Sequence, residues 1–198
     1  MMEPRKNRAI RAICVFCASS ESVGNVYRDA ATALGRQIGR LGAELIYGGA
    51  SIGLMGCVAR GVHEFNGKVV GILPEFFKGK DIDYKEVDEL IVTKDMRERK
   101  MVMDQRSDAF IVLPGGIGTL EEAMEILTMK QLRLTQKPLV FINTRNFYGG
   151  LLSYMKEIVE LKFAKPETLG LLVLEADAES ALNYILNYTA PLTPSKWL

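Results

Sequence analysis

Two patterns of apolar and polar residues take turns along this chain. Short continuous apolar runs, such as residues 109–113, are typical of strands that are buried on both faces of a sheet. Between these runs, apolar residues recur every three or four positions, as they do from Val26 to Leu41, which predicts amphipathic helices. The alternation of strand and helix predicts an α/β fold with a mostly parallel sheet and helices on both of its faces.

The same patterns predict where each element begins and ends. The expected strands cover residues 10–17, 44–47, 68–73, 90–93, 109–113, 139–142 and 171–174. The expected helices cover residues 26–41, 54–65, 96–106, 120–134, 151–161 and 178–188. The polar stretch 75–89 has neither pattern and is a candidate loop over a site.

Length and composition narrow the class of protein. The 198 residues suit one domain over 1–198, in which the polar residues 1–8 are expected to be flexible. A net charge of +1 gives no indication of a nucleic-acid or membrane partner. The odd number of cysteines, three, fits a cytoplasmic protein. Cys14 and Cys17 fall on opposite faces of a strand, which favours core positions over a redox pair or a metal site.

The most informative segment follows the apolar run 109–113 and reads PGGIGTLEE, with Gly115, Gly116 and Gly118 at a strand-to-helix turn. Ligands bind at such turns in open α/β sheets, because glycine admits a close backbone approach and the helix N-terminus attracts anions. This pattern predicts a phosphate cradle with Glu122 at its rim. The alternative is purely structural: TLEE fits a capping box in which Thr119 and Glu122 cap the helix.

Two further turns end at the same edge of the predicted sheet. One reads GGASIGLMG and begins at Gly48 and Gly49, and the other reads CASS and ends at Ser20. The first turn lacks the G-x-G-x-x-G of dinucleotide folds, and the chain has no Walker sequence. The turns therefore favour a mononucleotide, although the 48–56 segment fits an ordinary tight turn equally well.

The predicted helix 96–106 carries basic residues on an apolar face. Arg99 and Lys100 lie between Met96 and Met103 on that face. A buried cation needs a partner, which an anionic ligand or Glu122 could supply. The alternative is that both side chains extend past the apolar surface to water.

The segment 114–118, called the PGG turn below, is followed by a helix with apolar residues on two faces. The second stripe contains Glu122, Ile126, Met129 and Arg133. A helix that is apolar on two sides is buried on two sides, and a second subunit is the expected cover. His63, the single histidine, is interpreted as a structural residue.

Together these motifs resemble those of the LONELY GUY family, the cytokinin riboside 5′-monophosphate phosphoribohydrolases, whose members are often mislabelled lysine decarboxylases. Three motifs carry the resemblance: P-G-G-x-G-T-x-x-E from Pro114 to Glu122, the Arg99-Lys100 pair, and the glycine turn from Gly48 to Gly56. The resemblance covers essentially the whole chain. The chain departs from the family pattern at Ala18, Ala50 and Arg97.

The resemblance implies a Rossmann-like, doubly wound fold, a homodimer, and hydrolysis of the N-glycosidic bond of an AMP-like nucleotide, plain or N6-modified. It implies that Arg99 and Glu122 are catalytic. It also implies a substrate site in which the PGG turn and Ser20 hold the phosphate and Lys100 assists; the candidate substrate-binding residues are Ser20, Gly48, Gly49, Met96, Lys100, Gly115, Gly116, Gly118 and Thr119. No cofactor or metal is expected.

The residue types fit that chemistry. A carboxylate can stabilise an oxocarbenium-like transition state or take a proton from the attacking water, and an arginine can hold an anionic substrate. A broader nucleoside 5′-monophosphate nucleosidase and a non-catalytic nucleotide-binding protein remain alternatives. A lysine decarboxylase would need a Schiff-base lysine for pyridoxal phosphate, and Lys100 gives no specific sign of one.

Overall fold

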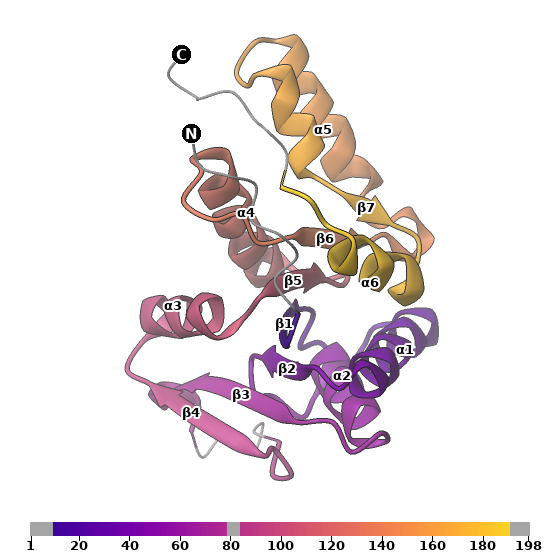
Figure 1. Ribbon diagram of the computed structural model, residues 1–198, viewed down its shortest axis with the longest axis vertical. Helices are drawn as coiled ribbons and strands as arrows, with labels where there is room; N and C mark the ends of the chain where they lie inside the picture. Colours follow the sequence, from indigo (N-terminus) through magenta and orange to yellow (C-terminus); the bar gives the residue numbers. More distant parts are fainter. Residues whose placement is uncertain (1–9, 79–83, 191–198) are drawn as a thin grey trace.

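A computed structural model describes residues 10–78 and 84–190, and its centre is a seven-stranded parallel sheet (Figure 1). The strand order across the sheet is β4-β3-β2-β1-β5-β6-β7. The strands are β1 (Ala12–Phe16), β2 (Glu44–Tyr47), β3 (Val69–Pro74), β4 (Glu89–Thr93), β5 (Ala109–Val112), β6 (Leu139–Ile142) and β7 (Leu174–Glu175). The expected flexible segment 1–8 lies outside the described residues.

Within the described residues, six α-helices cover the sheet on both faces, which confirms the predicted Rossmann-like architecture. They are α1 (Asn25–Leu41), α2 (Gly53–His63), α3 (Met96–Arg106), α4 (Ile117–Gln131), α5 (Gly149–Glu160) and α6 (Ala178–Leu186). Short 3-10 helices occupy Glu75–Phe77, Thr144–Asn146 and Pro166–Leu171. No helix in the described part of the chain is long and apolar enough to cross a membrane.

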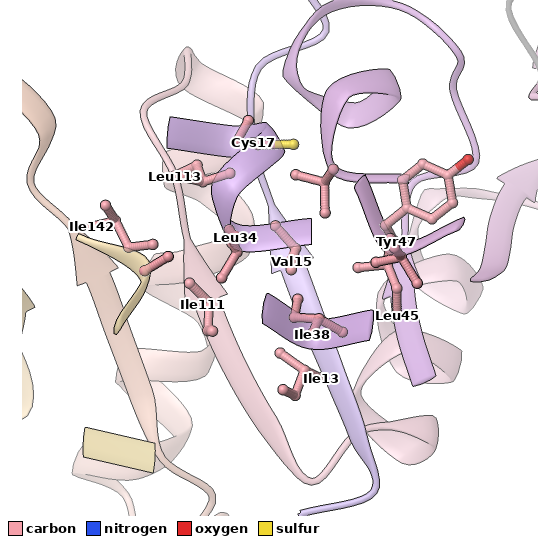
Figure 2. Close-up of a cluster of buried hydrophobic side chains, with 14 of the residues drawn as sticks. Ile13, Val15, Cys17, Leu34, Ile38, Leu45, Tyr47, Ile111, Leu113 and Ile142 are labelled. Carbon is pink, nitrogen blue, oxygen red and sulfur yellow. The ribbon is translucent and has the colours of Figure 1, made fainter. Parts of the chain in front are cut away.

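Alternate residues of each central strand are buried on opposite faces of the sheet. Ile13, Val15 and Cys17 pack against α1, α2 and α6, where Leu34 and Ile38 of α1 meet them (Figure 2). The alternate residues of β1, among them Cys14 and Phe16, face α3, α4 and α5. Cys14 and Cys17 are therefore buried on opposite faces as free thiols, as the alternation predicted.

The direction in which the chain adds strands to the sheet reverses at β1, which is the topological switch point. This strand pairs with β2 on one side and with β5 on the other, and Cys14 is aligned with both Ile46 and Phe110. The chain leaves the carboxyl ends of β1, β2 and β5 at one edge of the sheet. Ligands bind at this position in doubly wound sheets, and the three turns identified from the sequence lie there.

The structure corrects the expected start and end of the helix after the PGG turn. Helix α4 begins at Ile117 rather than at residue 120, and its N-cap, Gly116, makes no side-chain capping bond. Thr119 is thus inside the first turn and Glu122 inside the second, so the capping-box interpretation is wrong. Thr119 is buried and packs onto Gly115. At the other end, Arg133 has a φ of 61°, which turns Leu134 off the helix and leaves it exposed.

A second correction concerns the expected strand over residues 171–174. The chain forms a 3-10 helix from Pro166 to Leu171, and only Leu174 and Glu175 pair with β6. Leu171 and Leu172 are both buried although neither lies in the strand. A short apolar run does not by itself distinguish a strand from another buried segment, and Pro166 favours the start of a helical turn.

Candidate functional site

Backbone hydrogen bonds join the three turns at the carboxyl edge of the sheet. Ala18 N–H donates to the carbonyl of Pro114 at 3.2 Å, and Leu54 N–H donates to the carbonyl of Ala18 at 2.9 Å. Gly53 has a φ of +58°, and a Cβ there would lie 2.5 Å from the carbonyl carbon of Ser19. The turns after β1, β2 and β5 therefore form one surface, as the position of their motifs predicted.

The turn after β2 brings its backbone directly against a side chain of α3. A Cβ at Gly48 would lie 2.2 Å from Nη2 of Arg99 and 2.8 Å from Sδ of Met55. Gly49 has a φ of +80°, a conformation that favours glycine. Gly48 is thus needed for the approach of Arg99, and Gly49 for the bend of the chain.

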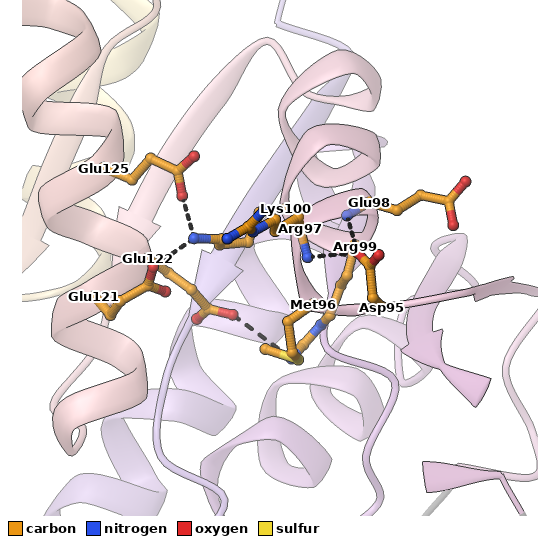
Figure 3. A network of polar contacts seen from close by, with 9 residues as sticks. All are labelled: Asp95, Met96, Arg97, Glu98, Arg99, Lys100, Glu121, Glu122 and Glu125. Carbon is orange, nitrogen blue, oxygen red and sulfur yellow. Dashed lines mark hydrogen bonds and ion pairs between the residues drawn. The ribbon is translucent and has the colours of Figure 1, made fainter. Parts of the chain in front are cut away.

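Arg99 of α3 and Glu122 of α4 face each other in the interior of this edge (Figure 3). Nη1 of Arg99 lies 3.7 Å from Oε1 of Glu122, and it also lies 3.7 Å from Sδ of Met96. Each of the two charged residues is only 9% exposed. Glu122 is one of the two partners expected for Arg99, and the structure confirms that contact.

Burial governs the electrostatics of this pair. Loss of water raises the pKa of Glu122 above its ordinary value, and the charge of Arg99 offsets only part of that effect. Nε of Arg99 is buried and has no hydrogen-bond partner among the described residues. A buried cationic group with an unused donor can bind an anion or an oxygen-rich ligand. The pair can therefore combine ligand binding with proton transfer.

Lys100 has a different environment from that of its neighbour Arg99. Its ammonium group contacts the carboxylate of Glu121 and lies 2.5 Å from Oε2 of Glu125, both on α4. Burial opposes the charge of Lys100, but the two carboxylates outweigh that effect and raise its pKa. The alternative that both side chains extend past the apolar surface to water is therefore wrong for the buried Arg99, whereas the ammonium group of Lys100 lies between two half-exposed carboxylates.

The PGG turn leaves its backbone open at two of its glycines. A Cβ at Gly115 would lie 2.1 Å from Oγ1 of Thr119, so that glycine is needed for packing. A Cβ at Gly116 or Gly118 would have no neighbour within 4 Å, so packing does not explain these two. The first backbone bond of α4 runs from Leu120 N–H to the carbonyl of Gly116, which leaves the N–H groups of the first turn available to a ligand.

Ser20 lies on the exposed turn after β1, where its Oγ accepts a hydrogen bond from Ser22 N–H at 3.3 Å. The hydrogen bond from Ala18 N–H to the carbonyl of Pro114 joins this turn to the PGG turn. The structure thus places Ser20 near the three-turn surface, and it shows no contact between Ser20 and the glycines of the PGG turn.

Sequence reasoning missed a cavity of about 190 Å³ between α3 and α4. Phe16, Ile126 and Met129 form apolar walls, and Lys100 and Glu122 are among the charged residues that line it. Ile126 is only 5% exposed within this chain. The expectation that a second subunit covers this stripe of α4 is therefore wrong for Ile126, because Ile126 belongs to the same buried core cluster as Phe16 of β1.

Residues 55–185 match the protein family described as "Possible lysine decarboxylase". Two cytokinin riboside 5′-monophosphate phosphoribohydrolases of Arabidopsis thaliana are 40% and 38% identical to this chain over 94% of its length, and the alignments cover 82% and 86% of those proteins. A probable enzyme of the same name from Oryza sativa subsp. japonica is 40% identical over 90% of this chain and 78% of its own. The chain belongs to the family of the cytokinin riboside 5′-monophosphate phosphoribohydrolases.

Solved structures with a similar fold carry a different description. A Moco carrier protein from Chlamydomonas reinhardtii is 26% identical, with a TM-score of 0.66 over 88% of this chain and 94% of its own. A molybdenum cofactor binding protein from Rippkaea orientalis is 24% identical, with a TM-score of 0.67 over the same shares. These structures agree with the Rossmann-like fold, and within the family's fold the site residues must decide the function.

Proposed function

We propose that this protein hydrolyses the N-glycosidic bond of a nucleoside 5′-monophosphate, namely AMP or an N6-modified AMP. The products are the free base and ribose 5-phosphate. The observation that carries the proposal is the buried Arg99–Glu122 pair beside an open helix N-terminus. Membership of the phosphoribohydrolase family supports it.

The 5′-phosphate binds at the start of α4. The backbone of Gly115, Gly116 and Gly118 and the first-turn N–H groups supply donors, and the helix dipole favours the negative charge. Thr119 fixes the shape of the turn through its contact with Gly115, and Ser20 adds a hydroxyl from the neighbouring turn. Glu122 lies five residues after Ile117, an axial rise of about 7.5 Å. That spacing suits a ribose placed between the phosphate and the carboxylate.

Arg99 and Glu122 act on the ribose. As the bond from C1′ to the base nitrogen breaks, the base leaves with the bonding electrons and positive charge develops on the ribose ring. The Glu122 carboxylate stabilises that charge, or it takes a proton from the water that attacks C1′. The departing base takes up one proton from solvent, which balances the proton that the attacking water loses. The raised pKa of Glu122 makes it a stronger base than an exposed glutamate. Arg99 holds the substrate and orients the carboxylate, while Gly48, Gly49 and Met96 shape the pocket around its guanidinium.

The environment of the lysines disfavours a pyridoxal-phosphate decarboxylase. A Schiff-base lysine must react in its neutral form, whereas Glu121 and Glu125 hold Lys100 in its charged form. Burial lowers the pKa of Lys130 to about 8. However, Lys130 lies twelve residues after Gly118, at the other end of α4 and roughly 18 Å along its axis. Lys100 is better placed to fix α3 against α4 beside the nucleotide.

Two alternatives remain testable. A broader nucleosidase would use the same residues on other bases. A non-catalytic binding protein is favoured by the fold likeness to the Moco carrier protein, but binding a phosphate needs no buried carboxylate beside it. The test is chromatography of the products after incubation with a panel of nucleoside 5′-monophosphates and with adenosine. Free base should appear from AMP and barely from adenosine; nucleotide binding without any product would favour the carrier alternative.

We also propose that the protein is a homodimer with the site near the interface. Two exposed apolar side chains lie beside the site, Met101 on α3 at 51% exposure and Ile117 on α4 at 89%. Light scattering at micromolar concentration should give twice the mass of the chain, and a monomer would contradict this part of the proposal.

A further inference from the structure

The segment 84–88 immediately precedes β4, and its first residue contacts the turn after β2. Tyr84 N–H donates a hydrogen bond of 3.0 Å to the carbonyl of Gly49. Gly49 also lies against β3, because a Cβ at Gly71 would be 3.0 Å from its Cα. The glycine turn is therefore held between a strand of the sheet and the Tyr84 backbone.

The side chain of Tyr84 is held in turn by His63, the last residue of α2. Nδ1 of His63 lies 2.9 Å from the Tyr84 hydroxyl, the two rings stack with centroids 5.5 Å apart, and the hydroxyl donates to Glu86 at 3.0 Å. Tyr84 is only 7% exposed. A buried phenol whose hydroxyl is bonded has a fixed position, which fixes its backbone N–H as well.

Asp88 fixes the other nitrogen of the imidazole. Nε2 of His63 lies 3.0 Å from Oδ2 of Asp88, and the same oxygen accepts a hydrogen bond of 2.7 Å from Val69 N–H. Burial opposes ionisation of Asp88, but the bonds from Val69 and His63 outweigh it and lower its pKa. Asp88 thus provides an acceptor beside the imidazole, and His63 links β3 to Tyr84.

We infer that His63 is a positioning residue for the hydrolysis, acting through Tyr84 and Gly49 on Arg99. The contacts form one continuous path: His63 holds Tyr84, Tyr84 holds Gly49, and the adjacent Gly48 is the surface against which the Arg99 guanidinium rests. A shift of this turn moves the guanidinium relative to Glu122, and small misplacements of that kind are costly in catalysis. The inference rests on the proposed function.

The next residue of the chain provides a matched control. Glu64 pairs with Arg36 of α1, with 2.6 Å between Oε2 and Nε, on the exposed side of α2. The pair holds α1 against the end of α2, and within the described part of the chain it forms no hydrogen bond or ion pair with Tyr84 or Gly49. Glu64→Gln therefore tests whether disturbing the end of α2 is enough to lower activity.

The experiment compares Tyr84→Phe, His63→Ala, His63→Gln and Glu64→Gln with the unmodified protein. We expect kcat for AMP to fall about tenfold in Tyr84→Phe and His63→Ala, with KM changed less than about twofold, because positioning rather than substrate binding is lost. His63→Gln should recover part of the loss, since its amide can contact both Tyr84 and Asp88. Glu64→Gln should keep normal kcat.

Amide hydrogen exchange at Tyr84, followed by NMR, gives a readout that does not need turnover. The amide that bonds to Gly49 should exchange faster in Tyr84→Phe and His63→Ala than in the unmodified protein. Its exchange rate should be unchanged in Glu64→Gln. If Tyr84→Phe and His63→Ala keep normal kcat, or if Glu64→Gln loses as much as they do, the positioning role is overturned. Absence of hydrolysis in the unmodified protein would instead overturn the proposed function, and the exchange rates would then still decide whether His63 holds the turn.

Discussion

The Arg99 guanidinium rests against Gly48, at a distance that leaves no space for a methyl group. A Cβ at Gly48 would lie 2.2 Å from Nη2 of Arg99, well inside van der Waals contact. Arg99 is held on its other side by Glu122, at 3.7 Å. The glycine thus determines how deeply the cation enters the site, which links a turn of β2 to a pair formed by α3 and α4.

Gly48→Ala should displace Arg99 and lower AMP hydrolysis by about a hundredfold, the effect expected from a misplacement of about 1 Å. Gly150→Ala is the matched control, because a Cβ at Gly150 has no neighbour within 4 Å. Initial rates of base release check both variants. Full activity in Gly48→Ala would mean that the approach of Arg99 to this turn does not matter for the reaction.

Gly118→Ala separates ligand approach from folding. Packing leaves room for a methyl group there, and alanine is the better helix former by up to about 1 kcal/mol. We therefore expect an equal or higher melting temperature. If the phosphate lies against this backbone, KM for AMP should rise by about tenfold or more, the loss of at least one charge-assisted hydrogen bond. An unchanged KM would remove Gly118 from the phosphate site.

The charges around Glu122 predict the acid limb of the pH profile. Glu122 must be ionised to act, so kcat/KM should fall as the pH drops through its raised pKa, above the ordinary value of 4.5. Lys100 lowers and Glu125 raises the pKa of Glu122. The limb should therefore move to higher pH in Lys100→Met and to lower pH in Glu125→Gln. Shifts in the opposite directions, or none, would show that another group controls the limb.

Lys130 is a buried cation far from the proposed site. Its Nζ donates to the carbonyl of Lys137 at 2.7 Å and to the Tyr188 hydroxyl at 2.8 Å. Burial lowers its pKa from 10.5 to about 8. Between these values the unfolded chain binds more protons at this position than the folded protein, so the contribution of Lys130 to stability increases as pH rises.

Lys130→Met should remove that contribution. Between pH 8 and 9.5 the unmodified protein should gain about 1.5 kcal/mol of unfolding free energy relative to the variant. Urea denaturation of both proteins at the two pH values measures the difference, in which the titration of other groups cancels. A difference that is constant with pH would contradict a lowered pKa for the buried Lys130.

Much of the fold could be predicted because its signals are local. The apolar runs and the helical spacing place most elements within a few residues, and parallel strands necessarily bring their carboxyl ends to one edge. That geometry is why Gly48 and Gly115 could be assigned to a common site. Leu134 shows the limit of periodicity, because it continues the apolar pattern of α4 although the backbone of Arg133 has already left the helix.

The contacts between elements that are distant in the sequence were harder to predict. The capping box failed because Thr119 packs onto Gly115, a contact that depends on the shape of the turn. The sequence left two possible partners for Arg99, an anionic ligand and Glu122. The contact with Glu122 depends on how α3 packs beside α4. The link from His63 to Gly49 had no signal in the sequence, since it depends on where the segment 84–88 crosses the edge of the sheet.

Glu122 is the residue on which the proposed hydrolysis chiefly depends. Glu122→Gln keeps the size of the side chain and removes its charge. Because burial already disfavours the ionised form, the variant should keep its melting temperature, and AMP should still bind to the PGG turn and Arg99. Loss of one negative charge near the phosphate could tighten that binding.

The decisive measurement is the rate of AMP hydrolysis by Glu122→Gln, with AMP affinity and melting temperature measured on the same preparation. The rate should fall by about a hundredfold or more, the usual contribution of a positioned acid–base group, with binding and stability retained. Unchanged hydrolysis in this variant would remove Glu122 from the mechanism and contradict the proposed role of the Arg99–Glu122 pair.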